Sequence, residues 1–272
     1  MLVNSELPLC MLKDNDRINE YDFILYHLCL KYPSYKEFFK RESSRLSMLD
    51  NSAYEFFIKK EAFNEGAFIS IIEELNPSYY IVPDVLMDKV VTIENYNKWR
   101  TKSISSDSKP MLIPQGRTLR EWLSCYFYFL ESGCSAIGIP FHNDFFYDLG
   151  LIFYHNNENA LPLKTFPSSS DVYYALGRYV LLQYLKDTSL IKKEIHYHLL
   201  GSHWVWEKHF YKNFDFIKTF DTGFPVKCAI EGFFLDEVCC KPHIIIDDFF
   251  EEQLSDSTKM LIERNISYFK NL

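Results

Sequence analysis

Short apolar runs alternate with amphipathic stretches along most of the chain. The apolar runs, rich in β-forming residues, predict strands at residues 46–49, 79–82, 111–113, 135–139, 196–200 and 216–220. Stretches with the apolar spacing of helices lie between several of them, at residues 60–75, 119–132, 172–185 and 204–213. This alternation is typical of a parallel sheet with crossover helices. For 272 residues we expect a single α/β domain over residues 1–272, a (β/α)8 TIM-like barrel, with two more strands at 8–12 and 23–28.

Polar side chains follow four of these runs, at the point where each predicted strand ends. They are Asp50, Asp84, Gln115 and Asp221. The carboxyl ends of the strands form the catalytic face of a parallel barrel, so we expect the four side chains to point into one mouth. Each residue also has a local explanation, because Asp and Gln commonly cap helices or lie in turns.

Asp221 is the strongest candidate for a catalytic nucleophile. Apolar residues, including Phe216, Ile217 and Phe220, precede it, and the turn-forming Gly223 and Pro225 follow. This pattern predicts a buried strand that delivers one carboxylate to a turn. The alternative is an aspartate that only caps the turn or the next helix.

Six short motifs in order carry a resemblance to a known family. They are LDNSAYE at 49–55, VPD at 82–84, IPQG at 113–116, AIGI at 136–139, HLLG at 198–201 and FDTGFP at 220–225. Over residues 46–227 their order and rough spacing resemble the tRNA-guanine transglycosylase superfamily. The resemblance implies a (β/α)8 barrel in which an aspartate attacks C1′ of a nucleotide, displaces the base and forms a covalent glycosyl-enzyme intermediate.

The resemblance also implies residue roles. Asp221 matches the nucleophile, Asp50 the second carboxylate, which moves protons, and Asp84 and Gln115 the residues that bind the base. Lys227 stands where the family usually has an arginine near the backbone phosphate. Further base-binding candidates are Gly138, Ile139 and Gly201. Possible site residues are His198, His203, Asn51 and Tyr54, and Glu55 and His142 are weaker candidates. Candidates to stack on a flipped nucleotide are Tyr54, Phe141, Phe145 and Trp204.

Three departures from the family pattern bear on the substrate: two favour DNA over tRNA as the partner, and one favours a base other than guanine. The sequence lacks the zinc-binding motif near the C-terminus and an appended RNA-binding domain, and Pro140 interrupts the base-pocket loop, where it donates no backbone N–H. The resemblance is therefore to the compact, DNA-acting branch: enzymes that insert 7-deazaguanines and glycosylases that attack modified phage DNA. We expect the protein to excise or exchange a flipped, modified nucleobase, so that the nucleobase is the leaving or the entering group. We expect this activity to serve in phage-host conflict. A tRNA-guanine transglycosylase, a noncatalytic nucleic-acid-binding barrel and a small-molecule nucleosidase remain alternatives.

Charge and cysteine usage narrow the remaining classes. The formal charge of −8 disfavours nonspecific coating of nucleic acid, although it allows a local basic groove. Seven scattered cysteines predict no disulfide framework. Cys228, Cys239, Cys240 and His243 suggest a metal cluster, but adjacent cysteines do not easily ligate one tetrahedral zinc and no CxxC spacing occurs. We expect no metal or cofactor, no membrane partner and a cytoplasmic location, and leave the oligomeric state open.

Overall fold

The computed structural model describes residues 1–41, 44–157, 170–236 and 249–272. The strands are β1 Leu2–Ser5, β2 Asp22–Leu25, β3 Ser47–Asp50, β4 Tyr79–Ile81, β5 Lys109–Leu112, β6 Ala136–Pro140, β7 His196–Leu200 and β8 Ile217–Thr222. The helices are η1 Leu9–Asp14, α1 Asn15–Ile18, α2 Tyr26–Lys31, α3 Pro33–Phe39, α4 Ala53–Lys59, α5 Glu65–Leu75, α6 Lys89–Trp99, α7 Leu119–Glu131, α8 Asp144–Asn157, α9 Ser170–Asp187, α10 Glu207–Tyr211, α11 Phe224–Ile230 and α12 Asp256–Asn271.

The eight strands form one sheet in the order β1-β8-β7-β6-β5-β4-β3-β2. The pairs with a defined register are all parallel, and a helix or helix pair follows each strand along the chain. This is the topology of a (β/α)8 TIM-like fold, so the predicted fold class is confirmed. No described helix combines the length and apolar character that a membrane crossing requires.

The chain divides into two compact units. The first unit comprises Met1–Glu20, Pro140–Lys193 and His198–Leu272, and the second comprises Tyr21–Ile139 and Glu194–Tyr197. The single domain expected over residues 1–272 stays a prediction.

Apolar strands and side-chain caps define the elements of the second unit. All four residues of β2 are buried, and β2 pairs with β3 so that Leu25 lies opposite Asp50. Asn64 caps α5 by accepting a hydrogen bond from the backbone N–H of Ala67 at 3.1 Å, and Asp88 and Thr118 cap α6 and α7 in the same way. Such caps satisfy backbone donors that the first turn of a helix leaves unpaired.

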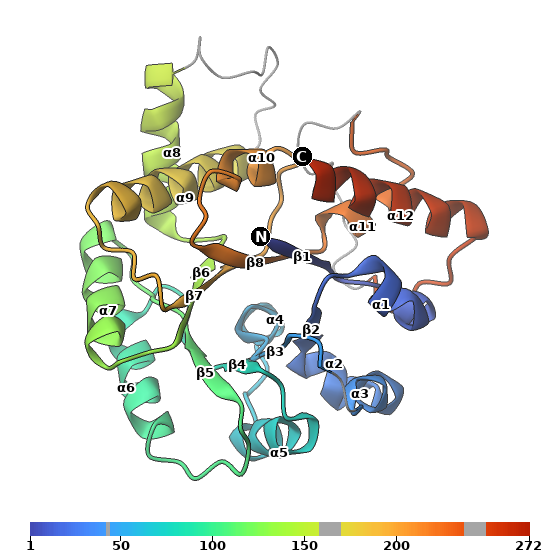
Figure 1. Cartoon of the computed structure of the whole chain (residues 1–272), viewed down its shortest axis with the longest axis horizontal. Helices are drawn as coiled ribbons and strands as arrows, with labels where there is room; N and C mark the ends of the chain where they lie inside the picture. Colours follow the sequence, from blue (N-terminus) through green and yellow to red (C-terminus); the bar gives the residue numbers. More distant parts are fainter. Residues whose placement is uncertain (42–43, 158–169, 237–248) are drawn as a thin grey trace. The chain divides into compact units, whose positions relative to one another are not determined.

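Two glycines set the packing of α8 and α9, which lie side by side in the first unit (Figure 1). A Cβ atom at Gly177 would overlap the backbone carbonyl of Phe146, and one at Gly150 would overlap that of Tyr173. The two helix backbones therefore touch at positions where any side chain would force them apart. This contact fixes the start of α9 against α8.

The C-terminal helix α12 packs against α11 in the same unit. Asn265, fully buried on α12, donates hydrogen bonds to the carbonyls of Pro225 at 3.2 Å and Phe233 at 3.0 Å, and accepts one from the N–H of Leu235 at 3.1 Å. Its amide thus satisfies three backbone groups of the segment after β8.

The predictions for the N-terminus were partly wrong. Residues 8–12 were expected to form a strand, but Leu9–Asp14 is a 3-10 helix and the first strand is Leu2–Ser5, which pairs with β8. The strand expected at 23–28 ends at Leu25, where α2 begins. A short apolar run is too short to show the periodicity that distinguishes a strand from a helix. Here tertiary pairing decides which of the two forms.

Two helix boundaries also differ from the predictions. The helix expected from residue 60 begins at Glu65, because Lys60 adopts a left-handed conformation that ends α4 and Asn64 caps α5. The helix expected at 204–213 is confined to Glu207–Tyr211.

Replacement of Gly177 by alanine should destabilise the protein by about 1–3 kcal/mol or more, because overpacking moves two backbones apart. Gly66→Ala is the matched control: it also lies in a helix, but its added Cβ would approach nothing closer than 3.7 Å. Urea unfolding of both variants measures the difference. Equal stability of Gly177→Ala and the wild-type chain would contradict this account of the contact.

Candidate functional site

Asp221 is the penultimate residue of β8 and is nearly buried, with 4% of its side chain exposed. Its Oδ1 atom accepts a hydrogen bond from the backbone N–H of Gly201 at 3.1 Å. The Nε2 atom of His198 lies 3.0 Å from the same oxygen. Within the described ranges no hydrogen bond to Oδ2 is formed, so the carboxylate is held through one oxygen.

Both groups that lie against Asp221 Oδ1 come from the end of β7. His198 is a buried residue of β7, and its Nδ1 atom lies 2.9 Å from the Thr219 hydroxyl on β8. Gly201, just after the strand, has a φ of 67°, a left-handed conformation that glycine adopts without strain. This left-handed conformation forms the turn from which the Gly201 N–H reaches the Asp221 carboxylate.

A second contact joins the segment after β7 to the end of β8. The hydroxyl of Thr222 donates to the carbonyl of Ser202 at 3.1 Å and accepts a hydrogen bond from the N–H of Phe224 at 3.0 Å. Both Ser202 and Thr222 are buried. The backbone directly after Asp221 is therefore fixed, as the preorganisation of a carboxylate requires.

Arg178 of α9 holds the carbonyls at the end of β7. Its guanidinium donates to the carbonyl of Leu200 at 2.9 Å and to that of Gly201 at 2.7 Å. It also forms a fully buried ion pair with Glu207, which accepts a further hydrogen bond from the Tyr211 hydroxyl at 2.7 Å. Burial lowers the pKa of Arg178, but the charge of Glu207 and the interactions of Arg178 with Tyr211 and Glu207 have the larger effect, so its pKa is raised. The guanidinium of Arg178 thus holds the backbone at Gly201 in place.

In the second unit, a polar network joins Asp84 to two amide side chains. Asn51 donates to Asp84 Oδ1 at 2.8 Å and to the carbonyl of Val82 at 3.0 Å, and Gln115 donates to Asp84 Oδ2 at 2.6 Å. The Gln115 side chain also accepts from the N–H of Met87 at 2.9 Å. Burial raises the pKa of Asp84, and the hydrogen bonds from Asn51 and Gln115 oppose this rise. These three predicted residues are therefore brought together.

Asp50 ends β3 and shapes the turn that follows. Its Oδ2 atom accepts a hydrogen bond from the N–H of Ser52 at 2.7 Å, and Asn51 Oδ1 accepts one from Ala53 at 2.8 Å. Ser52 adopts a left-handed conformation immediately before α4. Asp50 therefore has the local role in a turn that the sequence suggested as an alternative, and its catalytic role stays a prediction.

Gln115, Asp84 and Asp50 belong to the second unit, whereas Asp221 belongs to the first. Their expected convergence in one mouth stays a prediction. Gly138 and Ile139 lie inside β6, so the segment predicted as a base-pocket loop begins only after Pro140. Gly138 and Ile139, two of the base-binding positions that the resemblance implies, are thus buried strand residues.

Other predicted residues have definite environments. The ammonium group of Lys227 in α11 lies 5.6 Å from the centre of the Phe249 ring. Tyr54 is 51% exposed, which suits a stacking residue. The other three stacking candidates, Phe141, Phe145 and Trp204, are buried in the core.

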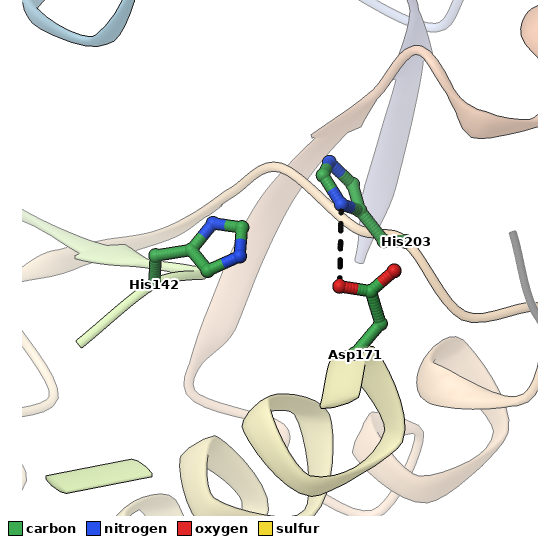
Figure 2. A group of neighbouring side chains, drawn as sticks. All are labelled: His142, Asp171 and His203. Carbon is green, nitrogen blue, oxygen red and sulfur yellow. Dashed lines mark ion pairs between the residues drawn. The ribbon is translucent and has the colours of Figure 1, made fainter. Parts of the chain in front are cut away.

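One group of possible metal ligands occurs in the described part of the chain, and it comprises His142, Asp171 and His203 (Figure 2). The sequence had suggested possible roles for both histidines but missed Asp171. No motif links residues 142, 171 and 203, so only the fold reveals the group. The alternative cluster weighed from the sequence includes Cys239, Cys240 and His243, which lie outside the described residues.

Comparison of the chain with models of known protein families found no match, and comparison with curated proteins found none either. The resemblance to the transglycosylase superfamily therefore rests on the six motifs alone.

Replacement of Arg178 by methionine should cost about 3–5 kcal/mol of stability, because it leaves the Glu207 carboxylate buried without its cation. The double variant Arg178→Met/Glu207→Gln should lose much less than the sum of the single losses, since no charge is then buried alone. Arg17→Met is the matched control, because the ion pair of Arg17 with Glu263 is exposed and should matter far less. Strictly additive losses in urea unfolding would exclude the coupling.

Asp84 should make stability depend on pH. Its folded-state pKa lies above the usual 3.8, so the protonated form favours folding. The resulting stabilisation is fully present below pH 3.8 and is lost as the pH rises through the raised pKa. The free energy of unfolding of the wild-type chain, relative to that of Asp84→Asn, should therefore fall from about pH 4 toward neutrality. A difference that is constant over this range would contradict the prediction.

Proposed function

We propose that the protein cleaves the N-glycosidic bond of a flipped nucleotide in DNA, with Asp221 as the nucleophile at C1′. The observation that carries the proposal is the environment of this carboxylate. One oxygen is held by the Gly201 N–H and lies beside His198, while no described hydrogen bond engages the other. A nucleophile needs an oriented carboxylate with one oxygen available for bond formation.

The site's place in the fold supports the same role. Asp221 lies near the carboxyl end of β8 in a (β/α)8 fold, and enzymes of this fold carry their catalytic residues at the carboxyl ends of strands. Local capping was the alternative for Asp221, but its oxygen instead accepts from Gly201, 20 residues away in the chain. The contact is therefore tertiary.

The proposed reaction has two steps. Oδ2 of Asp221 forms a bond to C1′ while the bond from C1′ to the base nitrogen breaks, and the electron pair and a proton go to the departing base. Water or an incoming base then displaces the aspartate from C1′. Attack by water leaves an abasic site, and attack by a base exchanges one base for another. In this scheme Asp50 is the group that moves protons on the base, as the resemblance implies.

The amide and carboxyl groups around Asp84 support recognition of a base. Asp84 and Gln115 fix each other's orientation, and Asn51 holds the second oxygen of Asp84. Such groups suit the donors and acceptors on the edge of a flipped base. The departures from the tRNA-acting enzymes favour DNA and a modified base over tRNA and guanine.

The test is incubation of the purified protein with unmodified DNA, phage DNA carrying hypermodified bases, tRNA and free nucleosides. Hot alkali and mass spectrometry of the released bases then report the products. Release of a base with alkali-labile breaks in DNA would indicate hydrolysis, and incorporation of a labelled 7-deazaguanine would indicate exchange. Reaction of tRNA or of free nucleosides alone would overturn the assignment to DNA.

Asp221→Asn should lower base release by at least about 1000-fold without unfolding the protein, because the amide is a poor nucleophile of nearly the same shape. Asp215→Asn is the matched control, since Asp215 is an exposed residue six positions earlier in the same unit. Unfolding curves establish that both variants are folded. Full activity of folded Asp221→Asn would refute the proposed nucleophile.

A further inference from the structure

Three side chains from separate segments of the first unit form a cluster with the composition of a transition-metal site. His142 follows β6, Asp171 lies in the first turn of α9, and His203 follows β7 (Figure 2). One ligand atom from each residue lies within 4.8 Å of the other two, and Nδ1 of His203 is 3.8 Å from Oδ1 of Asp171. We propose that this cluster binds a zinc-class divalent metal ion.

The distances fit a metal after small side-chain adjustments. A tetrahedral zinc with bonds of about 2.1 Å holds its ligand atoms about 3.4 Å apart. The longest separation within the cluster therefore has to shorten by no more than about 1.4 Å, given the limit of 4.8 Å. Rotation of the partly exposed side chains is enough for this, because His142 is exposed and the other two are half-buried.

The scaffold fixes the positions of Asp171 and His203 independently of the metal. The contact between Gly150 and Gly177 holds the start of α9, and with it Asp171, against α8. His203 lies two residues after Gly201, whose carbonyl accepts a hydrogen bond from Arg178 of the same helix α9. The positions of Asp171 and His203 are thus set by one helix.

Aromatic rings orient the two imidazoles. The centre of the Phe141 ring lies 4.9 Å from the centre of the His142 ring, with the two planes at 89°. It lies 4.8 Å from the centre of the His203 ring, with the planes at 35°. Tyr174 packs against His142 at 4.7 Å. Packing of this kind limits the rotamers of both histidines, so that less conformational entropy is lost when they ligate an ion.

The surroundings of the cluster favour a cation. The carboxylates of Asp144, Asp148 and Asp171 all act electrostatically on Tyr174, which packs against His142, so negative charge gathers around the cluster. Asn143, next to His142, is buried, and neither polar atom of its side chain forms a hydrogen bond within the described ranges. A buried amide of this kind is expected where an ion and its waters complete the hydrogen bonding.

The donor set selects the class of metal. Imidazole nitrogens suit zinc, iron, cobalt and nickel, whereas calcium and magnesium prefer oxygen ligands throughout. Two histidines and one carboxylate leave at least one coordination position for water or an anionic oxygen of a substrate. The proposed site does not depend on the proposed glycosidic chemistry, and it departs from the expectation, based on the sequence, that no metal binds.

The experiment uses the full chain, stripped of metal with a chelator and dialysed. Titration calorimetry with zinc chloride and elemental analysis should give one zinc ion per chain. Asp171→Asn and His142→Gln should each weaken zinc binding by at least about 100-fold, because loss of an outer-shell partner alone costs 10- to 100-fold. Zinc should also raise the Tm of the wild-type chain and leave that of the variants unchanged.

Two variants serve as matched controls. His155→Gln changes an exposed histidine of α8 and Asp187→Asn an exposed aspartate of α9, and both should bind zinc as the wild-type chain does. Absence of stoichiometric binding, or equal binding by the folded ligand variants, would overturn the proposal. A cobalt complex with thiolate charge-transfer absorption would also overturn it, since cysteines would then hold the metal.

Discussion

The buried guanidinium of Arg178 is the group on which the environment of Asp221 depends. It holds the carbonyls of Leu200 and Gly201, and the N–H of Gly201 in turn holds Asp221. A cation without water is costly, and Glu207 offsets that cost from the adjoining helix α10. The stability of this unit and the orientation of its carboxylate are therefore linked through one side chain.

The two carboxylates implied by the resemblance to have distinct roles also have distinct local structures. Asp221 accepts a tertiary hydrogen bond through one oxygen, whereas Asp50 accepts one from the N–H of Ser52 in the turn after its own strand. Asp84 differs from both, because two amide side chains engage its two oxygens. Environment, rather than residue type, decides what a carboxylate can do.

The sequence predicted the fold class and most strands because most strands contain a short apolar run rich in β-forming residues, and four of these runs are followed by a polar residue. The boundaries of β7 agree at both ends, and Asp221 lies at a strand end as expected. The first strand was missed because Leu2–Ser5 is defined by its pairing with β8, which no local pattern reveals. Arg178 and Asp171 were missed for a related reason: both lie on a long helix, and their partners come from distant segments.

The close contact between α8 and α9 has a consequence for the protein's evolution. Because the backbones touch at both Gly150 and Gly177, a side chain at either position would push the helices apart and weaken the contact at the other. Proteins that share an ancestor with this chain should retain the two glycines together, or change both as the helices separate. The pair would then mark common descent in sequences too divergent for their motifs to be aligned, and it belongs to the scaffold rather than to the chemistry.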